Sequence, residues 1–166
     1  MITHIQGDCI AIAKEKDSVI IPHIVNDIGA WGSGFVLDLS EEWPISLKER
    51  SPEYIYRNIG YMLGGNTYCH PEIYNDEIKI TVVNMCAQHG ISSKSTGDRS
   101  KINQKPIRYV HLVSCMKHVA NLAICNKAEI VCPKFGSGRA GGNWNFIEEL
   151  IEEIWGDFNV TVCSLS

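Results

Sequence analysis

Two glycine-rich segments, each between an apolar run and an amphipathic run, constrain the fold of this 166-residue chain more than any other feature. The first covers residues 27–34 and follows the apolar run 19–26, and the second covers 133–143 and follows 128–132. Each unit has the pattern of a strand, a flexible loop and a helix start. Because such loops gather at the carboxyl ends of parallel strands, both are expected at one edge of a sheet.

Loops of this composition are suited to phosphate. Glycine lets backbone N–H groups turn toward a ligand without a side chain in the way, and a helix start adds partial positive charge. Two such loops facing one crevice indicate a diphosphate, for which ADP-ribose is the natural candidate.

The rest of the chain alternates between strand and helix patterns. We expect strands at 2–6, 18–26, 78–85, 128–133 and 159–164, and helices at 9–14, 33–43, 107–125 and 144–155. A hairpin around 64–66 is also expected, with an exposed mobile loop over 90–105. In the long helix, Val110, Val113, Met116 or Lys117, and Ala120 trace one face. The pattern predicts one α/β domain over residues 1–166, a three-layer α/β/α sandwich with a mixed, mainly parallel sheet.

Composition narrows the function classes. A net charge of −4 is poor for a general nucleic-acid binder, which needs a basic surface. The seven cysteines are odd in number and lack C-x-x-C spacing, so they are interpreted as buried thiols in a reducing compartment. The histidines at positions 4, 70, 111 and 118 share no ligand spacing, and no metal or cofactor is expected. The sequence shows no signal peptide and no apolar run of membrane-spanning length, which favours a cytoplasmic protein without a membrane partner.

Five blocks in order carry a family resemblance: Gly7-Asp8, the segment 23–35, the segment 83–91, Lys105 to Tyr109, and the segment 133–144. Together they resemble a macrodomain, in the branch with ADP-ribose-1″-phosphate phosphatases and terminal ADP-ribose protein glycohydrolase. The chain lacks the lysine after the central strand and the acid in the second glycine loop of that glycohydrolase, so it looks closer to the phosphatase-like members. Such members also occur in bacteriophages, and the resemblance allows a phage source.

The resemblance implies binding roles. Asp8 would accept a hydrogen bond from the adenine amino group, with Cys9 beside the base. Asn26 or Asp27 would approach the distal ribose. The remaining implied ligand contacts are Gly29, Gly32, Ser33, Gly34 and Phe35 in the first loop, Gln88 after the central strand, and Phe135, Gly136, Ser137, Gly138, Arg139, Ala140, Gly141 and Trp144 in the second.

Three residues at the first loop are candidates for catalysis: His23, Asn26 and Asp27. His23 could exchange a proton near neutral pH, or be a hydrogen-bonded core histidine. Asp27 could orient water, or cap the loop. We therefore expect either a hydrolase that removes the terminal phosphate of ADP-ribose-1″-phosphate, or cleaves a related ADP-ribose linkage, or a non-catalytic module that binds ADP-ribose or a related signalling nucleotide. Nucleic acid is expected only as an ADP-ribosylated substrate.

Overall fold

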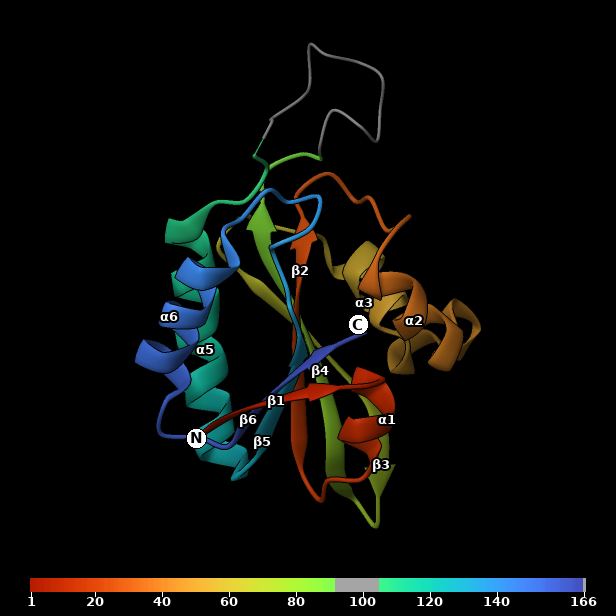
Figure 1. Cartoon of the computed structure of the whole chain (residues 1–166). Coiled ribbons are helices and arrows are strands. Elements are labelled where there is room, and N and C mark those ends of the chain that lie inside the picture. Colours follow the sequence, from red (N-terminus) through yellow and green to blue (C-terminus); the bar gives the residue numbers. More distant parts are fainter. Residues whose placement is uncertain (92–104, 166) are drawn as a thin grey trace.

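The computed structural model describes residues 1–91 and 105–165. One six-stranded sheet forms its centre, with strand order β1-β6-β5-β2-β4-β3 (Figure 1). The strands are β1 (Ile2–Gln6), β2 (Val19–Asn26), β3 (Asn66–Tyr74), β4 (Glu77–Gln88), β5 (Glu129–Pro133) and β6 (Val160–Ser164). All neighbouring pairs are parallel except β3 and β4, which are antiparallel. The predicted mixed, mainly parallel sheet is confirmed.

Helices cover both faces of this sheet (Figure 1). On one side lie α5 (Tyr109–Asn126) and α6 (Trp144–Trp155). On the other lie α1 (Cys9–Lys14), α2 (Phe35–Glu42) and α3 (Pro52–Ile59), with a 3₁₀ segment, η1 (Ile45–Arg50), between α2 and α3. This is the predicted three-layer α/β/α sandwich. Residues 45–59, for which no element is predicted from the sequence, are mostly helical.

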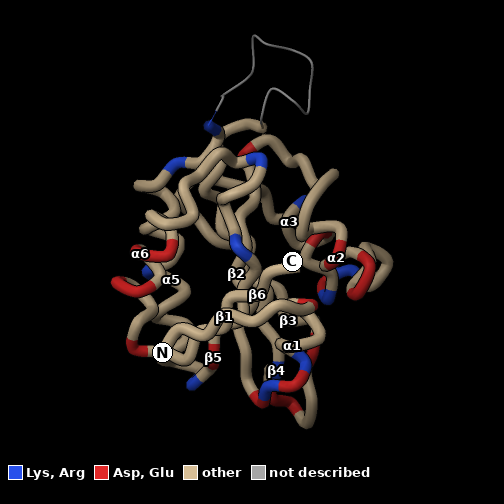
Figure 2. The backbone as a smooth tube through the Cα atoms, viewed as in Figure 1, with Lys and Arg blue, Asp and Glu red and all other residues tan. Residues whose placement is uncertain are grey.

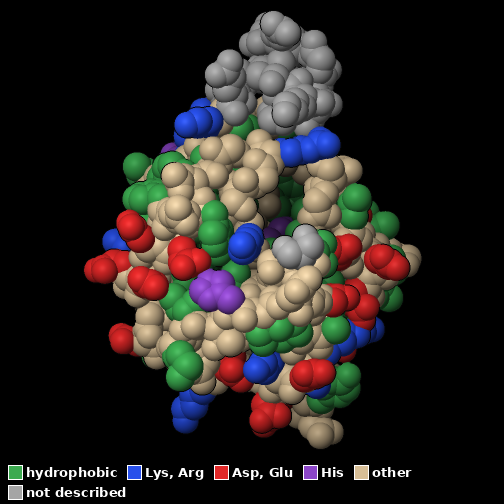
Figure 3. All heavy atoms as spheres, viewed as in Figure 1, with side chains coloured by type: hydrophobic (Ala, Val, Ile, Leu, Met, Phe, Trp, Pro, Cys, Tyr) green, Lys and Arg blue, Asp and Glu red, His purple; other side chains and the backbone are tan. Residues whose placement is uncertain are grey.

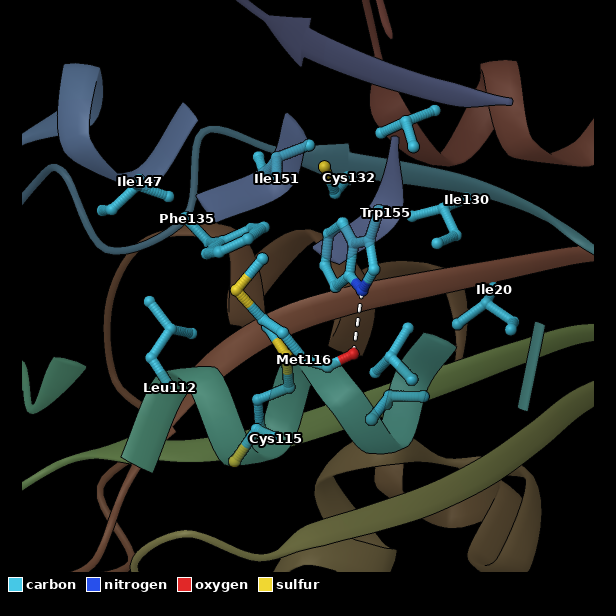
Figure 4. Close-up of a cluster of buried hydrophobic side chains, with 14 of the residues drawn as sticks. Ile20, Leu112, Cys115, Met116, Ile130, Cys132, Phe135, Ile147, Ile151 and Trp155 are labelled. Atoms are coloured by element: carbon cyan, nitrogen blue, oxygen red, sulfur yellow. Dashed lines mark hydrogen bonds between the residues drawn. The ribbon is translucent and has the colours of Figure 1, made fainter. Parts of the chain in front are cut away.

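A buried tryptophan packs in the core between the sheet and the α5–α6 layer. Trp155 is fully buried and donates from Nε1 to the Met116 carbonyl oxygen at 2.9 Å, which ties α6 to α5 (Figure 4). On α5 the buried face consists of Leu112, Cys115, Met116, Val119 and Ala123. The predicted face was wrong, since Val110 is 82% exposed. The helix is apolar on several sides, so more than one stripe has helical spacing and packing selects among them.

The antiparallel hairpin lies elsewhere than expected. β3 pairs with β4 through a turn at Asn75 and Asp76, whose φ angles are 51° and 63°. Two consecutive positive φ values are typical of a tight two-residue hairpin turn. The predicted hairpin around residues 64–66 is therefore wrong. The expected mobile loop over 90–105 falls mostly on residues 92–104, which lie outside the described residues.

Most cysteines lie in the protein core. Six cysteines are buried and Cys125 is exposed. Burial raises the pKa of the Cys132 thiol, which keeps that group protonated. None of the helices in the described part of the chain has the length and apolarity needed to cross a bilayer.

Candidate functional site

A cavity of about 570 Å³ opens where β2, β4 and β5 end, and both glycine loops contribute to its wall. Figure 3 shows a hollow on this face, with Lys and Arg side chains near its rim. The predicted site residues that line the cavity are His23, Asn26, Gly32, Ser33, Gly34, Phe35, Gln88, Phe135, Gly136, Gly138, Arg139 and Ala140. The two loops, far apart in sequence, therefore meet at one site of a size typical for ligands.

The first loop is held in shape by Asn26 at the end of β2. The Asn26 side-chain oxygen accepts from the N–H groups of Ile28 and Ala30 at 3.1 and 3.0 Å, and its Nδ2 donates to the Ala30 carbonyl oxygen at 2.8 Å. The buried Tyr56 hydroxyl donates to the Asn26 carbonyl oxygen at 2.5 Å. Asn26 is thus the scaffold of this loop as well as part of the cavity wall.

The same loop delivers a helix N-terminus to the cavity. Gly34, Phe35 and Val36 line the wall, and α2 begins at Phe35. Gly34 has φ of +85°, a left-handed conformation that glycine adopts without strain. No side chain of the described residues caps α2, so the first N–H groups of this helix have no side-chain acceptor. Such a terminus attracts an anion.

The second loop closes on itself. The Gly142 N–H donates to the Gly136 carbonyl oxygen at 2.8 Å, and the Gly141 N–H donates to the Gly138 carbonyl oxygen at 3.0 Å. A Cβ added at Gly142 would lie 2.4 Å from the Gly136 carbonyl oxygen. Only glycine fits there, because a backbone atom cannot move aside as a flexible side chain can. The N–H group of Gly141 is used inside the loop.

Positive charge collects at this cavity although the protein is acidic. Lys134 and Arg139 both line its wall. Lys134 Nζ lies 5.8 Å from the centre of the Trp144 ring, a cation–π contact that holds the amine near the loop. Acidic residues instead gather on α2 and α6, as Figure 2 shows. The distribution favours an anionic ligand in the cavity despite the net charge of −4.

His23 lies on β2 in the wall of the cavity and is only 2% exposed. Its Nε2 is 2.5 Å from Asn84 Oδ1 on the neighbouring strand β4. The rings of Trp31 and Phe35 flank it edge-on, with ring centres 5.8 and 5.7 Å away. Burial lowers the pKa of His23 from 6.5 to about 4, against a smaller opposing effect of the Asn84 hydrogen bond. The imidazole is therefore neutral at physiological pH.

Asp27 is turned to a different partner. Its carboxylate accepts from the Gly90 N–H at 2.7 Å and lies 2.6 Å from His89 Nδ1. Burial alone would raise the pKa of this carboxyl, but the bonds from Gly90 and His89 outweigh it and lower the pKa. Asp27 is not part of the cavity wall, and it ties the end of β2 to the segment after β4.

Asp8 and Cys9 lie at the start of α1, outside the cavity wall. The Asp8 carboxylate accepts from the Ile10 N–H at 2.9 Å and from the Ala11 N–H at 3.3 Å, so it is the N-cap of this helix. Cys9 is buried in the core beneath. A hydrogen bond with the Cys163 side chain and burial both raise the pKa of the Cys9 thiol, so this thiol stays neutral.

Four further predicted ligand contacts lie away from the wall: Gly29, Ser137, Gly141 and Trp144. Gly29 has φ of +79°, and a Cβ added there would lie 2.5 Å from the Tyr61 hydroxyl, so its role here is to let the loop pass that ring. Asn143 caps α6 by accepting from the Phe146 N–H at 3.2 Å, so this helix start has a side-chain partner, unlike that of α2.

Sequence reasoning missed part of the wall: Ile24, Val25, Ala30, Val36, Ile91, Pro133 and Lys134. Lys134 follows β5 directly, and a cation at a strand end before a glycine loop is a signal that could have identified it. Ile24, Val25 and Pro133 belong to strands and Val36 belongs to α2, so their apolar character gave no separate signal, and Ala30 and Ile91 lie in loops. Within residues 1–91 and 105–165, no three His, Cys, Asp or Glu side chains come together as metal ligands.

Several solved structures resemble this chain over nearly its whole length. No protein-family model and no curated protein matches the chain. Among solved structures, a Bacteroides thetaiotaomicron protein of unknown function is 36% identical over 98% of this chain and 97% of its own, with a TM-score of 0.79. A macrodomain protein from Streptomyces coelicolor is 29% identical over 99% of both chains, with a TM-score of 0.73.

More distant structures share the fold alone. Thermosipho africanus DarTG, solved in complex with ADP-ribose, is 11% identical over 98% of this chain and 41% of its own, with a TM-score of 0.70. The macrodomain of Mycobacterium tuberculosis DarG is 14% identical with a TM-score of 0.71. The order of strands, the two glycine loops at their carboxyl ends and the likeness to the Streptomyces coelicolor macrodomain lead to one assignment: this chain has the macrodomain fold.

Proposed function

We propose that the cavity between the two glycine loops binds ADP-ribose or a close derivative. The observation that carries this proposal is the start of α2, which no described side chain caps and which lines the cavity opposite the second loop. Lys134 and Arg139 add positive charge to the same wall. The free helix start and the positive side chains both favour a diphosphate, and the complex of Thermosipho africanus DarTG with ADP-ribose supports the choice of nucleotide.

Binding is tested by calorimetry with ADP-ribose and a pair of charge reversals. Lys134→Glu should weaken binding about tenfold or more, since a hydrogen bond to a charged group contributes about 1.5–3 kcal/mol. Lys117→Glu changes the net charge equally on the exposed side of α5 and should leave the affinity unchanged. No heat with the native protein at high concentration would refute the proposal. Equal loss in both variants would show only a general charge effect.

The second candidate function is hydrolysis of the terminal phosphate of ADP-ribose-1″-phosphate, or of a related linkage. What favours it is the contact of Asp27 with His89, which directly follows the cavity residue Gln88. A carboxylate bonded to an imidazole can orient it for proton transfer. Burial lowers the pKa of His23, which makes this imidazole a weak proton acceptor, and the Asn26 amide is used to hold the first loop. Both observations favour a smaller role for these two residues in proton transfer.

Phosphate release from ADP-ribose-1″-phosphate separates an enzyme from a binding module. An active enzyme should lose most of its rate in Asp27→Ala and in His89→Ala. The exposed His118→Ala is the control and should keep the native rate. A native protein that binds ADP-ribose yet releases phosphate only at the background rate would refute the hydrolase and leave the binding module.

A further inference from the structure

A chain of hydrogen bonds crosses the sheet and ends on His23. Asn84 Nδ2 donates to Thr67 Oγ1 on β3 at 3.1 Å and to the Pro52 carbonyl oxygen at 3.3 Å. Asn84 Oδ1 lies 2.5 Å from His23 Nε2. His23 and Asn84 are register partners on the parallel strands β2 and β4, so the two side chains stand side by side on one face of the sheet.

The Pro52 carbonyl determines which way the Asn84 amide points. A carbonyl oxygen can only accept, so the amide atom that faces it must be the NH₂ group. The reversed amide would put two acceptor oxygens 3.3 Å apart. Oδ1 therefore faces His23, and since this oxygen also only accepts, the proton of the contact must reside on His23 Nε2.

The other imidazole nitrogen is consequently a bare acceptor. A neutral imidazole carries one N–H, and that one is spent on Asn84. His23 Nδ1 is buried, and among the described residues it has no hydrogen-bond partner. Buried polar atoms are rarely left unpaired in proteins, and such exceptions call for a functional explanation.

We propose that Asn84 is a positioning residue that holds His23 in the Nε2–H form, so that Nδ1 accepts a hydrogen bond from a hydroxyl of the ligand. The inference rests on the proposed function and deepens it. The ligand group that contacts His23 Nδ1 must be a hydrogen-bond donor, and we assign it to a sugar hydroxyl. A carbonyl or phosphate oxygen would place a second acceptor against Nδ1. Nδ1 is closed to water in the structure, so a side chain must shift before the hydroxyl reaches it, and of the two rings that flank His23 only Phe35 lines the cavity.

The ligand-free native protein tests the first half. Nitrogen-15 NMR of the imidazoles distinguishes protonated from bare ring nitrogens. At neutral pH His23 should show a protonated Nε2 and a bare Nδ1. A proton on Nδ1, whether in the other neutral form or in the doubly protonated ring, would overturn the inference. This measurement needs no variant and is independent of whether ADP-ribose binds.

Addition of ADP-ribose tests the second half. The nitrogen-15 signal of Nδ1 should move toward that of a hydrogen-bonded nitrogen on saturation, while Nε2 stays protonated. Binding by calorimetry without any change at Nδ1 would overturn this inference and leave the proposed function intact. Absence of binding would overturn both.

A double-mutant cycle tests whether Asn84 acts through His23. Asn84→Ala should weaken ADP-ribose binding about tenfold in the native background and have no further effect in His23→Ala, since residues in one hydrogen-bond network are not additive. Asn121→Ala makes the same change on the exposed side of α5 and should have no effect in either background. An equal loss from Asn84→Ala with and without His23 would overturn the positioning role.

Discussion

The burial of His23 predicts a loss of stability in mild acid. Its pKa is about 4 in the folded protein and 6.5 when exposed, so between these values the unfolded chain binds more protons than the folded one. The stabilisation is complete above pH 6.5 and disappears as the pH falls toward 4. From these two pKa values, the free energy of unfolding should fall by about 2 kcal/mol between pH 7 and pH 5 on account of this one side chain.

Urea titrations of the native protein and of His23→Gln at both pH values isolate the effect. Glutamine can still donate to Asn84 Oδ1 but does not titrate, so the native protein should lose about 2 kcal/mol more than this variant. Carboxylates that titrate in the same range cancel in the difference. His118→Gln replaces an exposed histidine and should follow the native protein. If the native protein and His23→Gln lose the same free energy, His23 is not held neutral by burial and the reasoning is refuted.

Three further predictions concern the loops and α1. Gly142→Ala should lower the free energy of unfolding by about 1–3 kcal/mol, because its methyl would lie 2.4 Å from the Gly136 carbonyl oxygen. Gly138→Ala is the control, since a Cβ at that position meets open space, and it should change little in the same urea titrations. Equal losses in the two variants would contradict this packing. Tyr56→Phe removes the one buried hydroxyl proton that Tyr56 donates to Asn26 in the turn after β2 and should cost about 1–3 kcal/mol, so an unchanged urea midpoint would count against that role. Asp8→Ser keeps an N-cap oxygen and should keep thermal stability, yet should weaken ADP-ribose binding by about 1.5–3 kcal/mol if this carboxylate contacts the adenine. Calorimetry that finds native affinity would remove Asp8 from the binding site.

The layers and the meeting of the two loops were predictable from the sequence because both follow from local patterns. A buried strand such as β2 is almost continuously apolar, and a glycine loop at its end has few alternatives to a turn at the sheet edge. The hairpin was missed although its signal was present: Asn75 and Asp76 are residue types that accept positive φ in a two-residue turn. The two glycines at 64–65 carry an equally strong turn signal, but they precede β3 and do not join two strands.

Side-chain direction was harder to predict. Asp27 follows a strand that ends at the cavity, but its carboxylate bonds to Gly90 and His89, which directly follow β4. The pairing of β2 with β4 across more than fifty residues decides this, and no local pattern encodes it. For the same reason the alternatives for His23 stayed open until its neighbours Asn84, Trp31 and Phe35 were placed around it.

The position of β1 has a consequence for how the chain acquires its structure during synthesis. Among the strands of the described sheet β1 is synthesised first, yet it lies at the sheet edge and its neighbour is β6, with Ile2 opposite Val160. Residues 2–6 must therefore wait, unpaired with their neighbour in this sheet, until β6 has been synthesised. A nascent chain stalled shortly before residue 160 should therefore hold the inner strands in contact while residues 2–6 stay open to proteases.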